Sequence, residues 1–376
     1  MKITIVTGAF LPVPPMMGGA VEKAWFALAQ EFARRGHEVA IVSRKLPELE
    51  REEVVDGVRH LRVRGFDTPR SLVWLKFLDL LYSIRTMSIL PAANIVVTNT
   101  FWLPILLRDS SRGKIYVHAG RFPKGQMRFY RRATRLQAPS AAVADAIKTE
   151  APQLASKVVA IPYPVAATHP GNPPPLEKRA KVILFVGRVH PEKGVHLLVE
   201  AFAKKARTVF ADWKLMIVGP AEEKYGGGGG AYLARLKRLA RGTDNVVFHG
   251  AVFDPSLLEA EFRSARLFVY PSLAEKGEAF GLAPLEAMAH GCAVLVSNLK
   301  CFGDFIHDGE TGFMFDHRAA EPASALGVII EQLLVDQASL ARVADFGYRK
   351  SAEYSLERVA DQFLADFDLL RRESHG

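Results

Sequence analysis

Short apolar runs rich in β-branched residues alternate with helical segments along the chain, and this rhythm restricts the fold more than any other feature. In the first half, buried strands are predicted at residues 3–7, 38–43, 95–98, 115–118 and 158–161. Between the first two, residues 21–35 have apolar side chains at helical spacing and stop at Gly36-His37. Strand–helix–strand succession implies right-handed crossovers and a parallel sheet.

The rhythm restarts after a proline-rich break. Six prolines fall between residues 162 and 175, a density that predicts an interdomain linker. Strands are then predicted at 182–186, 215–218, 246–248, 267–270 and 293–296, and helices at 194–206, 232–240, 256–263, 284–290 and from 319 onward. The sequence therefore predicts an α/β chain of two doubly wound Rossmann-like domains, residues 1–165 and 166–355. A C-terminal helix is also predicted at 356–376, and from its position in the chain it can cross back to the first domain.

Composition excludes several classes of protein. The 376 residues are 49% hydrophobic, enough for two cores, and 24% charged, which speaks against disorder. The two cysteines, Cys292 and Cys301, lack metal or redox spacing and favour a reducing, cytoplasmic setting. Residues 71–90 are interrupted by charges and predict an amphipathic helix rather than a membrane span. The apolar start is too short for a signal peptide and predicts a first strand.

The positive charge lies in the first half. Residues 1–165 hold 24 Lys and Arg against 13 Asp and Glu, whereas the remainder holds 25 against 27. Residues 110–144 contain no acid and have interleaved aromatic residues. Such a patch suits an anionic membrane or a phosphorylated acceptor; a solvated basic helix is the alternative. No nucleic-acid-binding module is present, so nucleic acid is not an expected partner. The predicted patch comprises Arg121, Lys124, Arg128, Arg131, Arg132 and Arg135.

Two glutamates eight positions apart, Glu278 and Glu286, flank a predicted helix start at Gly281. A helix N-terminus presents backbone N–H groups and positive potential to an anion, and a carboxylate accepts hydrogen bonds from a diol. This segment therefore indicates a pocket for a polyhydroxylated, anionic ligand. An acidic first turn that only satisfies the helix dipole is the alternative. The N–H groups concerned are those of Phe280, Gly281 and Leu282.

Two cations follow the first strand of the second domain. Arg188 and Lys193 lie at the carboxyl edge of the predicted sheet, where open parallel sheets bind ligands. A planar guanidinium fork and a mobile ammonium suit a diphosphate. Within the same domain, the glycine run 226–230 lacks the lysine and hydroxyl of a phosphate-binding loop, which predicts a flexible surface loop.

The first domain has weaker signals. Gly18-Gly19 before a helix lets the backbone approach a ligand, although the pattern is not that of a dinucleotide site. His118 ends a predicted strand and is a candidate for the cleft between the domains, while a structural role is the usual one for a lone histidine. Asp366-Phe367-Asp368 falls on an amphipathic helix with its acids in solvent, so no metal site is expected.

Together these motifs resemble the retaining nucleotide-sugar glycosyltransferases of family 4, which have the GT-B fold with an interdomain cleft. The resemblance spans nearly the whole chain. Its departures are Ala279, where glycine or proline is usual, and the extra glycine-rich loop. The matching pieces are Gly18-Gly19 with Glu22, Arg34 through Val39, His118, Gly187-Arg188 with Lys193-Gly194, Val218-Gly219, Pro271-Ser272, and Glu278-Ala279-Phe280-Gly281 through Glu286-Ala287-Met288, with Gly291 and Val294 following.

The resemblance implies a role for each matching residue. Arg188 and Lys193 would hold the donor diphosphate, Glu286 the ribose, and Glu278 the transferred sugar together with the N–H groups at 280–282. Gly19 would let its loop reach the phosphate, His118 would face the sugar, and backbone near Val252 would read the base. The catalytic set would be Glu278, Arg188, Lys193 and His118.

The implied activity is metal-independent, retaining transfer of a hexose from a UDP- or GDP-sugar. A lipid-linked or polysaccharide acceptor, such as lipopolysaccharide core or exopolysaccharide, is expected, with no cofactor. The enzyme would be cytoplasmic and able to bind the inner face of the membrane peripherally. A nucleotide-sugar epimerase and a non-catalytic nucleotide-sugar-binding protein stay open as alternatives.

Overall fold

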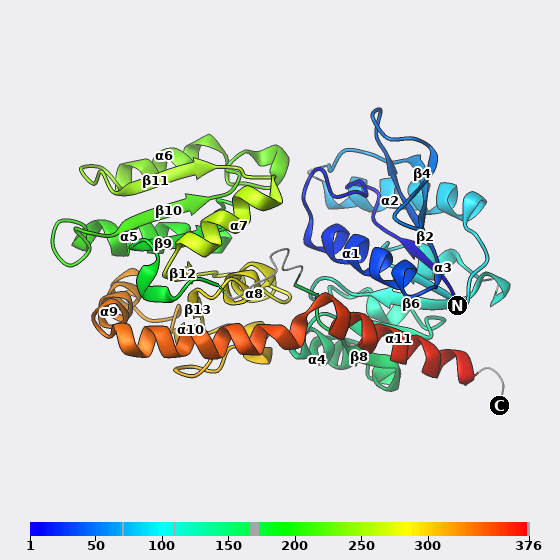
Figure 1. The fold of residues 1–376 in the computed structure, drawn as a ribbon. Helices are drawn as coiled ribbons and strands as arrows, with labels where there is room; N and C mark the ends of the chain where they lie inside the picture. Colours follow the sequence, from blue (N-terminus) through cyan, green and yellow to red (C-terminus); the bar gives the residue numbers. More distant parts are fainter. Residues whose placement is uncertain (70, 109, 166–172, 374–376) are drawn as a thin grey trace. The chain divides into compact units, whose positions relative to one another are not determined.

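The computed structural model describes residues 1–69, 71–108, 110–165 and 173–373 and divides into two compact units (Figure 1). Unit 1 comprises Met1–Pro164 with Leu356–Gly376, and unit 2 comprises Val165–Ser355. Each is a Rossmann-like α/β unit with a mainly parallel sheet, which confirms the predicted fold class. Residues 166–172 of the predicted linker lie outside the described residues.

Unit 1 is built on an eight-stranded sheet in the order β3-β4-β2-β1-β5-β6-β7-β8. Only β3 is antiparallel, to β4. Strand order runs outward from β1 in both directions, as in a doubly wound sheet. The strands are β1 (Lys2–Val6), β2 (Glu38–Lys45), β3 (Glu52–Val55), β4 (Val58–Arg64), β5 (Ile95–Thr98), β6 (Lys114–His118), β7 (Arg135–Ala138) and β8 (Val158–Ala160).

The hairpin of β3 and β4 and the strand β7 were not predicted. Asp56 and Gly57 join the hairpin with φ values of 51° and 77°. An Asp-Gly pair between apolar runs is a strong local signal for such a turn, because both residues tolerate positive φ. Strand β7 lies within the basic segment, where residues 121–134 contain only a short 3₁₀ turn, Met127–Phe129. The basic-helix alternative is therefore wrong.

The last helix belongs to the core of unit 1. Helix α11 packs against α1 and β6, and its Phe367 ring lies 4.9 Å from Tyr116, edge to face. Figure 1 shows this red helix beside elements from the start of the chain. The helices of unit 1 are α1 (Ala20–Arg34), α2 (Leu72–Ile89), α3 (Leu103–Leu106), α4 (Ala141–Glu150) and α11 (Leu356–Arg372).

One ion pair joins α11 to strand β7 of the sheet, and it contradicts the predictions made for Asp366 and Arg135. Arg135 Nη2 lies 2.7 Å from Asp366 Oδ1, and the two side chains are only 13% and 10% exposed. Asp366 is therefore not a solvated acid. Arg135 is likewise committed to the interior of unit 1 and does not belong to a membrane-facing patch.

Unit 2 has a six-stranded, all-parallel sheet in the order β11-β10-β9-β12-β13-β14. The strands are β9 (Val182–Val186), β10 (Lys214–Val218), β11 (Val246–Gly250), β12 (Leu267–Tyr270), β13 (Ala293–Ser297) and β14 (Phe313–Phe315). The helices are α5 (Val195–Lys205), α6 (Gly229–Leu239), α7 (Pro255–Ser264), α8 (Leu282–Ala289), α9 (Pro322–Val335) and α10 (Gln337–Ser351).

Strand order in unit 2 reverses between β9 and β12. The chain leaves β9 toward β10 on one side, while β12 pairs with β9 on the other. In open parallel sheets this switch point opens a crevice beyond the carboxyl ends of the strands, where ligands bind.

None of the described helices is by itself long and apolar enough to cross a membrane, although the bent pair Pro322–Val335 and Gln337–Tyr354 would be if the two were counted together.

Candidate active site

The loops that follow β9 and β12 meet at the switch point of unit 2. Gly194 closes the first of them with φ +65°, and a Cβ there would lie 1.9 Å from the carbonyl oxygen of Pro271. Leu273 N–H also donates to Glu192 O at 2.7 Å. This close approach, which only glycine permits, brings Lys193 beside the segment that carries Ser272 and Glu278.

Lys193 and Glu278 form a buried ion pair. Lys193 Nζ lies 2.6 Å from Glu278 Oε2, and Ser272 Oγ donates to the same oxygen at 3.1 Å. Burial alone lowers the pKa of Lys193, but Tyr270 and Glu278 together outweigh it and raise that pKa. The ammonium is therefore held charged, and its remaining N–H groups can serve an anionic ligand.

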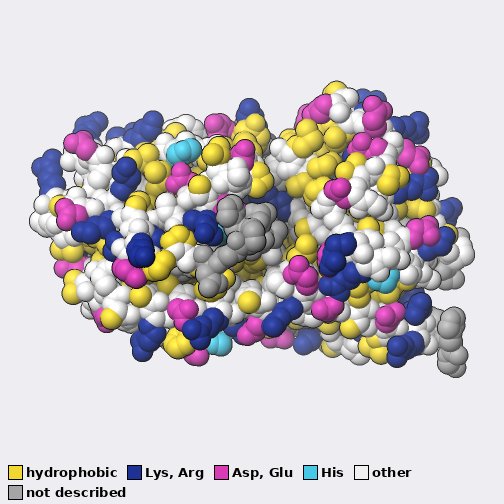
Figure 2. All heavy atoms as spheres, viewed as in Figure 1, with side chains coloured by type: hydrophobic (Ala, Val, Ile, Leu, Met, Phe, Trp, Pro, Cys, Tyr) yellow, Lys and Arg dark blue, Asp and Glu magenta, His cyan; other side chains and the backbone are white. Residues whose placement is uncertain are grey.

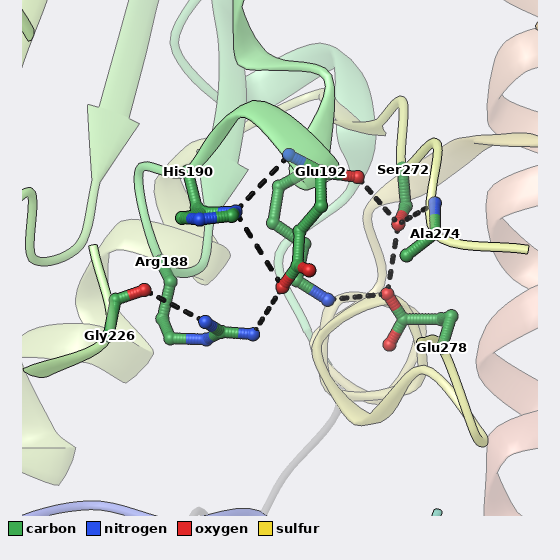
Figure 3. A network of polar contacts seen from close by, with 8 residues as sticks. Arg188, His190, Glu192, Gly226, Ser272, Ala274 and Glu278 are labelled. Carbon is green, nitrogen blue, oxygen red and sulfur yellow. Dashed lines mark hydrogen bonds and ion pairs between the residues drawn. The ribbon is translucent and has the colours of Figure 1, made fainter. Parts of the chain in front are cut away.

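Arg188 is fixed at both ends of its guanidinium (Figure 3). Its Nη2 lies 2.6 Å from Glu192 Oε1, and its Nη1 donates to the carbonyl of Gly226 at 2.8 Å. Burial raises the pKa of Glu192, yet Arg188 and Lys193 lower it by more. The exposed arginine is thus an oriented cation at the edge of the sheet.

Sequence reasoning assigned no role to Glu192, Ser272 or Gly226. For Glu192 the sequence does contain a signal, because it stands four positions after Arg188, a spacing at which the two side chains can pair. Gly226 contacts Arg188 from a segment 38 positions later in the chain, so nothing local indicated it. The glycine run, predicted to be a flexible surface loop, begins near exposed residues and ends at exposed Gly230, but Gly227 and Gly229 are buried.

Helix α8 begins as predicted. Gly281 is its N-cap residue with φ 91°, and a glycine has no side chain with which to cap the helix. A Cβ on Gly281 would lie 2.3 Å from Phe302 Cε1, so the turn admits only glycine. Glu278 precedes the helix and half-buried Glu286 lies on its second turn. The Phe280 side chain is buried, so this residue can offer a ligand only its backbone.

Val252, the position expected to read the base, lies between β11 and α7 and is half-buried. Its neighbour Phe253 is exposed, and the Phe253 ring centroid lies 5.2 Å from that of Tyr225. An aromatic pair therefore adjoins the predicted base position.

Gly19 and His118 belong to unit 1. Gly19 has φ +101° at the start of α1, and a Cβ there would lie 2.2 Å from Glu22 Oε2. His118 ends β6 and is buried, with its ring nitrogens against Gln137 Oε1 and, at 2.9 Å, Tyr163 OH. Burial lowers the pKa of His118 to about 4. These contacts suit a neutral structural histidine, and its role toward a sugar stays a prediction.

The basic segment retains five cations on the surface: Arg121, Lys124, Arg128, Arg131 and Arg132 are exposed. Beside them, Tyr130 contacts Phe101 with ring centroids 6.3 Å apart. On the face drawn in Figure 2, basic and acidic side chains are interspersed over each unit, so no field of one sign dominates that face. Within the four described ranges, no three His, Cys, Asp or Glu side chains gather so as to hold a metal ion.

Two Rossmann-like units, one with oriented cations at its switch point, define a chain of the GT-B fold. Residues 17–169 match the family model described as glycosyltransferase family 4, and residues 172–350 match that described as glycosyl transferases group 1. The chain belongs to the glycosyltransferases of family 4.

Relatives and solved structures agree with this membership. The lipopolysaccharide 1,2-N-acetylglucosaminetransferase of Salmonella typhimurium is 34% identical over 188 residues, 49% of this chain and 47% of that protein. The phosphatidyl-myo-inositol mannosyltransferase of Mycobacterium leprae is 30% identical over 220 residues, 57% of this chain and 54% of that protein. The chain thus spans about half the length of the curated relatives it matches.

Sucrose-phosphate synthase from Thermosynechococcus elongatus has a TM-score of 0.76 at 20% identity, covering 98% of this chain and 99% of that one. HepE from Anabaena, solved in complex with UDP-glucose, has a TM-score of 0.72 at 20% identity with coverage of 98% and 99%. These two likenesses show the fold.

Proposed function

We propose that this protein is a metal-independent, retaining glycosyltransferase that moves a hexose from a nucleoside diphosphate sugar. The observation that carries the proposal is the convergence, at one switch point, of Arg188, the Lys193–Glu278 pair and the start of α8 at Gly281. Two cations and a helix N-terminus match a diphosphate, and a buried carboxylate beside them matches sugar hydroxyls. HepE, which shares the fold, was solved with UDP-glucose, and this supports the same class of donor.

The proposed reaction breaks the bond between the sugar C1 and the diphosphate oxygen. The acceptor hydroxyl oxygen bonds to C1 on the same face, and its proton passes to the departing phosphate oxygen. Arg188 and Lys193 stabilise the negative charge that grows on that phosphate. Glu278 holds the transferred hexose by its hydroxyl groups, while Glu286 binds the ribose. The roles of Gly19 and His118 remain predictions from the family resemblance.

The test measures donor binding and turnover for purified protein with UDP-, GDP- and ADP-sugars, first by thermal shift. Lys193→Ala and Glu286→Ala are expected to lower turnover by at least about 100-fold, because each removes a contact to the bound donor. Lys204→Ala is the control, since Lys204 is exposed and pairs with Glu200 on its own helix. If Lys193→Ala and Glu286→Ala turn over the donor as fast as the unmodified protein does, the roles proposed for Lys193 and Glu286 are refuted. An epimerised donor without acceptor, or tight binding without transfer to any acceptor, would identify the alternative functions.

We also propose that unit 1 carries a lipid-linked or polysaccharide acceptor at an anionic membrane surface. The start of α2 has an exposed apolar face in which Val73 is 79% and Trp74 is 53% exposed. Phe101 links this helix to the basic segment, since its N–H bonds Asp79 of α2 and its ring contacts Tyr130. Apolar insertion together with surface cations is the usual basis of peripheral binding. The names of the Salmonella and mycobacterial relatives support such acceptors.

Flotation with anionic liposomes tests this surface. Binding at low salt is expected, and reversing the charges of Arg128, Arg131 and Arg132 should abolish it, because each cation contributes about 1 kcal/mol near an anionic bilayer. The matched control reverses Lys237, Arg238 and Arg241, three exposed cations of unit 2. If the unmodified protein does not float at low salt, the membrane proposal is rejected, while the proposal for the donor site is not affected.

A further inference from the structure

The glycine-rich segment, which departs from the family pattern, is a fixed part of unit 2. We call residues 222–229 the glycine loop. Gly228 N–H donates to Val189 O at 2.9 Å and Gly229 N–H donates to Ala221 O at 2.8 Å. A Cβ on Gly227 would lie 2.2 Å from the carbonyl carbon of Ala221. The loop is therefore held by hydrogen bonds and by backbone contacts that only glycine allows.

The middle of the glycine loop holds Arg188. The Gly226 carbonyl accepts from Nη1 at 2.8 Å, while Glu192 holds Nη2 at 2.6 Å (Figure 3). Gly226 has φ +79°, and a Cβ there would lie 3.0 Å from Arg188 Cδ and 3.1 Å from Nη1. An exposed arginine normally samples many rotamers, and fixing it in advance lowers the entropy lost when a ligand binds.

The same part of the glycine loop also reaches the predicted base position. Tyr225 directly precedes Gly226, and its ring packs on Phe253 at 5.2 Å with an interplanar angle of 62°. Phe253 in turn follows Val252. A single short segment therefore joins the arginine at the phosphate end to an aromatic pair beside the base-reading backbone.

We propose that the glycine loop positions the donor's nucleoside diphosphate. The Gly226 carbonyl orients Arg188 toward the diphosphate, and the Tyr225–Phe253 pair forms an aromatic wall for the nucleobase, since any base presents a planar π face to such rings. The inference rests on the proposed function, because Arg188 binds the diphosphate only if that function is right.

The main experiment compares Gly226→Ala with the unmodified protein by equilibrium binding of UDP, GDP and inorganic pyrophosphate. The added methyl group meets Arg188 and strains a positive φ, so binding of the preferred nucleotide and of pyrophosphate is expected to weaken about tenfold. Gly242→Ala is the matched control, because Gly242 also has φ +79° and faces an arginine, Arg207, at 3.1 Å. Gly230→Ala is the second control, since nothing lies within 4 Å of its Cβ position. Both controls should bind the nucleotide like the unmodified protein.

A double-mutant cycle with Arg188→Ala separates this inference from the proposed function. If Gly226 acts through Arg188, Gly226→Ala weakens binding in the normal background and has no further effect in the Arg188→Ala background. An undiminished effect in both backgrounds would overturn the positioning role while the proposed function stands. Arg188→Ala that binds nucleotide normally would instead refute the proposed role of Arg188.

The aromatic wall has its own readout. Tyr225→Ala is expected to weaken nucleoside diphosphate binding about tenfold and to leave pyrophosphate binding unchanged, because pyrophosphate has no base to stack. Equal losses for the two ligands would overturn the wall, as would no loss for either. Unfolding midpoints of each variant show whether a loss of binding follows from loss of the fold.

Discussion

Glu22 is a buried carboxyl group whose protonation is expected to control the stability of unit 1. Its side chain lies at the start of α1, packed against Gly19. Burial raises its pKa from 4.5 to about 7, and its own backbone N–H and the Arg121 charge offset only part of that rise. Between these two pKa values, the native state therefore keeps the Glu22 proton that the unfolded chain releases. We predict that Glu22→Gln, which cannot ionise, stabilises the protein at alkaline pH.

The magnitude follows from proton linkage. Because the native pKa is the higher one, the stability that Glu22 contributes is fully present below pH 4.5 and is lost as the pH rises toward 7. Between pH 5 and pH 8 the unmodified protein should lose roughly 2 kcal/mol through this group, at about 1.4 kcal/mol per pKa unit. The free-energy difference between Glu22→Gln and the unmodified protein should shift by that amount in favour of the variant.

Urea unfolding at pH 5 and pH 8, followed by tryptophan fluorescence, measures this shift. Three of the four tryptophans, Trp25, Trp74 and Trp102, belong to unit 1, so the signal reports mainly on that unit. Other titrating groups cancel in the difference between variant and unmodified protein. A difference in unfolding free energy that is the same at both pH values would refute the reasoning.

Glu31 on the same helix is the matched control. It is also buried, but Arg34 and Arg35 hold its carboxylate and lower its pKa despite the opposing effect of burial. Its stabilising contribution is present above pH 4.5 and is lost as the pH falls below that value. Glu31→Gln should therefore destabilise the protein, and by more at pH 8 than at pH 4. The same sign of pH dependence for both variants would contradict the assignment of their environments.

Two further predictions concern stability and the donor site. Asp366→Ala leaves Arg135 buried without its carboxylate and should cost about 3–5 kcal/mol in urea unfolding, and a loss below 1 kcal/mol would show that the pair is solvated. Gly281→Ala places a methyl group against Phe302 at the start of α8 and should abolish nucleotide binding in a thermal-shift assay. Gly303→Ala, with nothing within 4 Å of its Cβ position, should bind normally. Normal binding by both glycine variants would refute the role of that helix start.

The sequence predicted the features that depend on local pattern. The strand–helix rhythm, the second sheet and the start of α8 at Gly281 follow from apolar periodicity and glycine placement. The hairpin at Asp56-Gly57 also has a local signal, the Asp-Gly pair between apolar runs. The three-residue strand β14 is too short for periodicity to reveal.

The features that were missed depend on contacts between distant residues. Arg135 looked like one more surface cation, yet its partner Asp366 lies 231 positions away. The glycine run looked loose because its composition is that of a flexible linker, whereas hydrogen bonds to Val189 and Ala221 fix it. Lys193 and Glu278 were assigned separate ligands, and the structure shows that each is also the other's counter-ion.

Helix α11 has a consequence for synthesis of the protein. Val359, Phe363 and Phe367 fill the core of unit 1, but they leave the ribosome only after all of unit 2 has been made. Because domains usually fold as their chain emerges, unit 1 must wait with its apolar core incomplete while unit 2 folds. A chaperone that binds exposed apolar surface should therefore associate with nascent chains that end before residue 356 and release them once the helix has emerged.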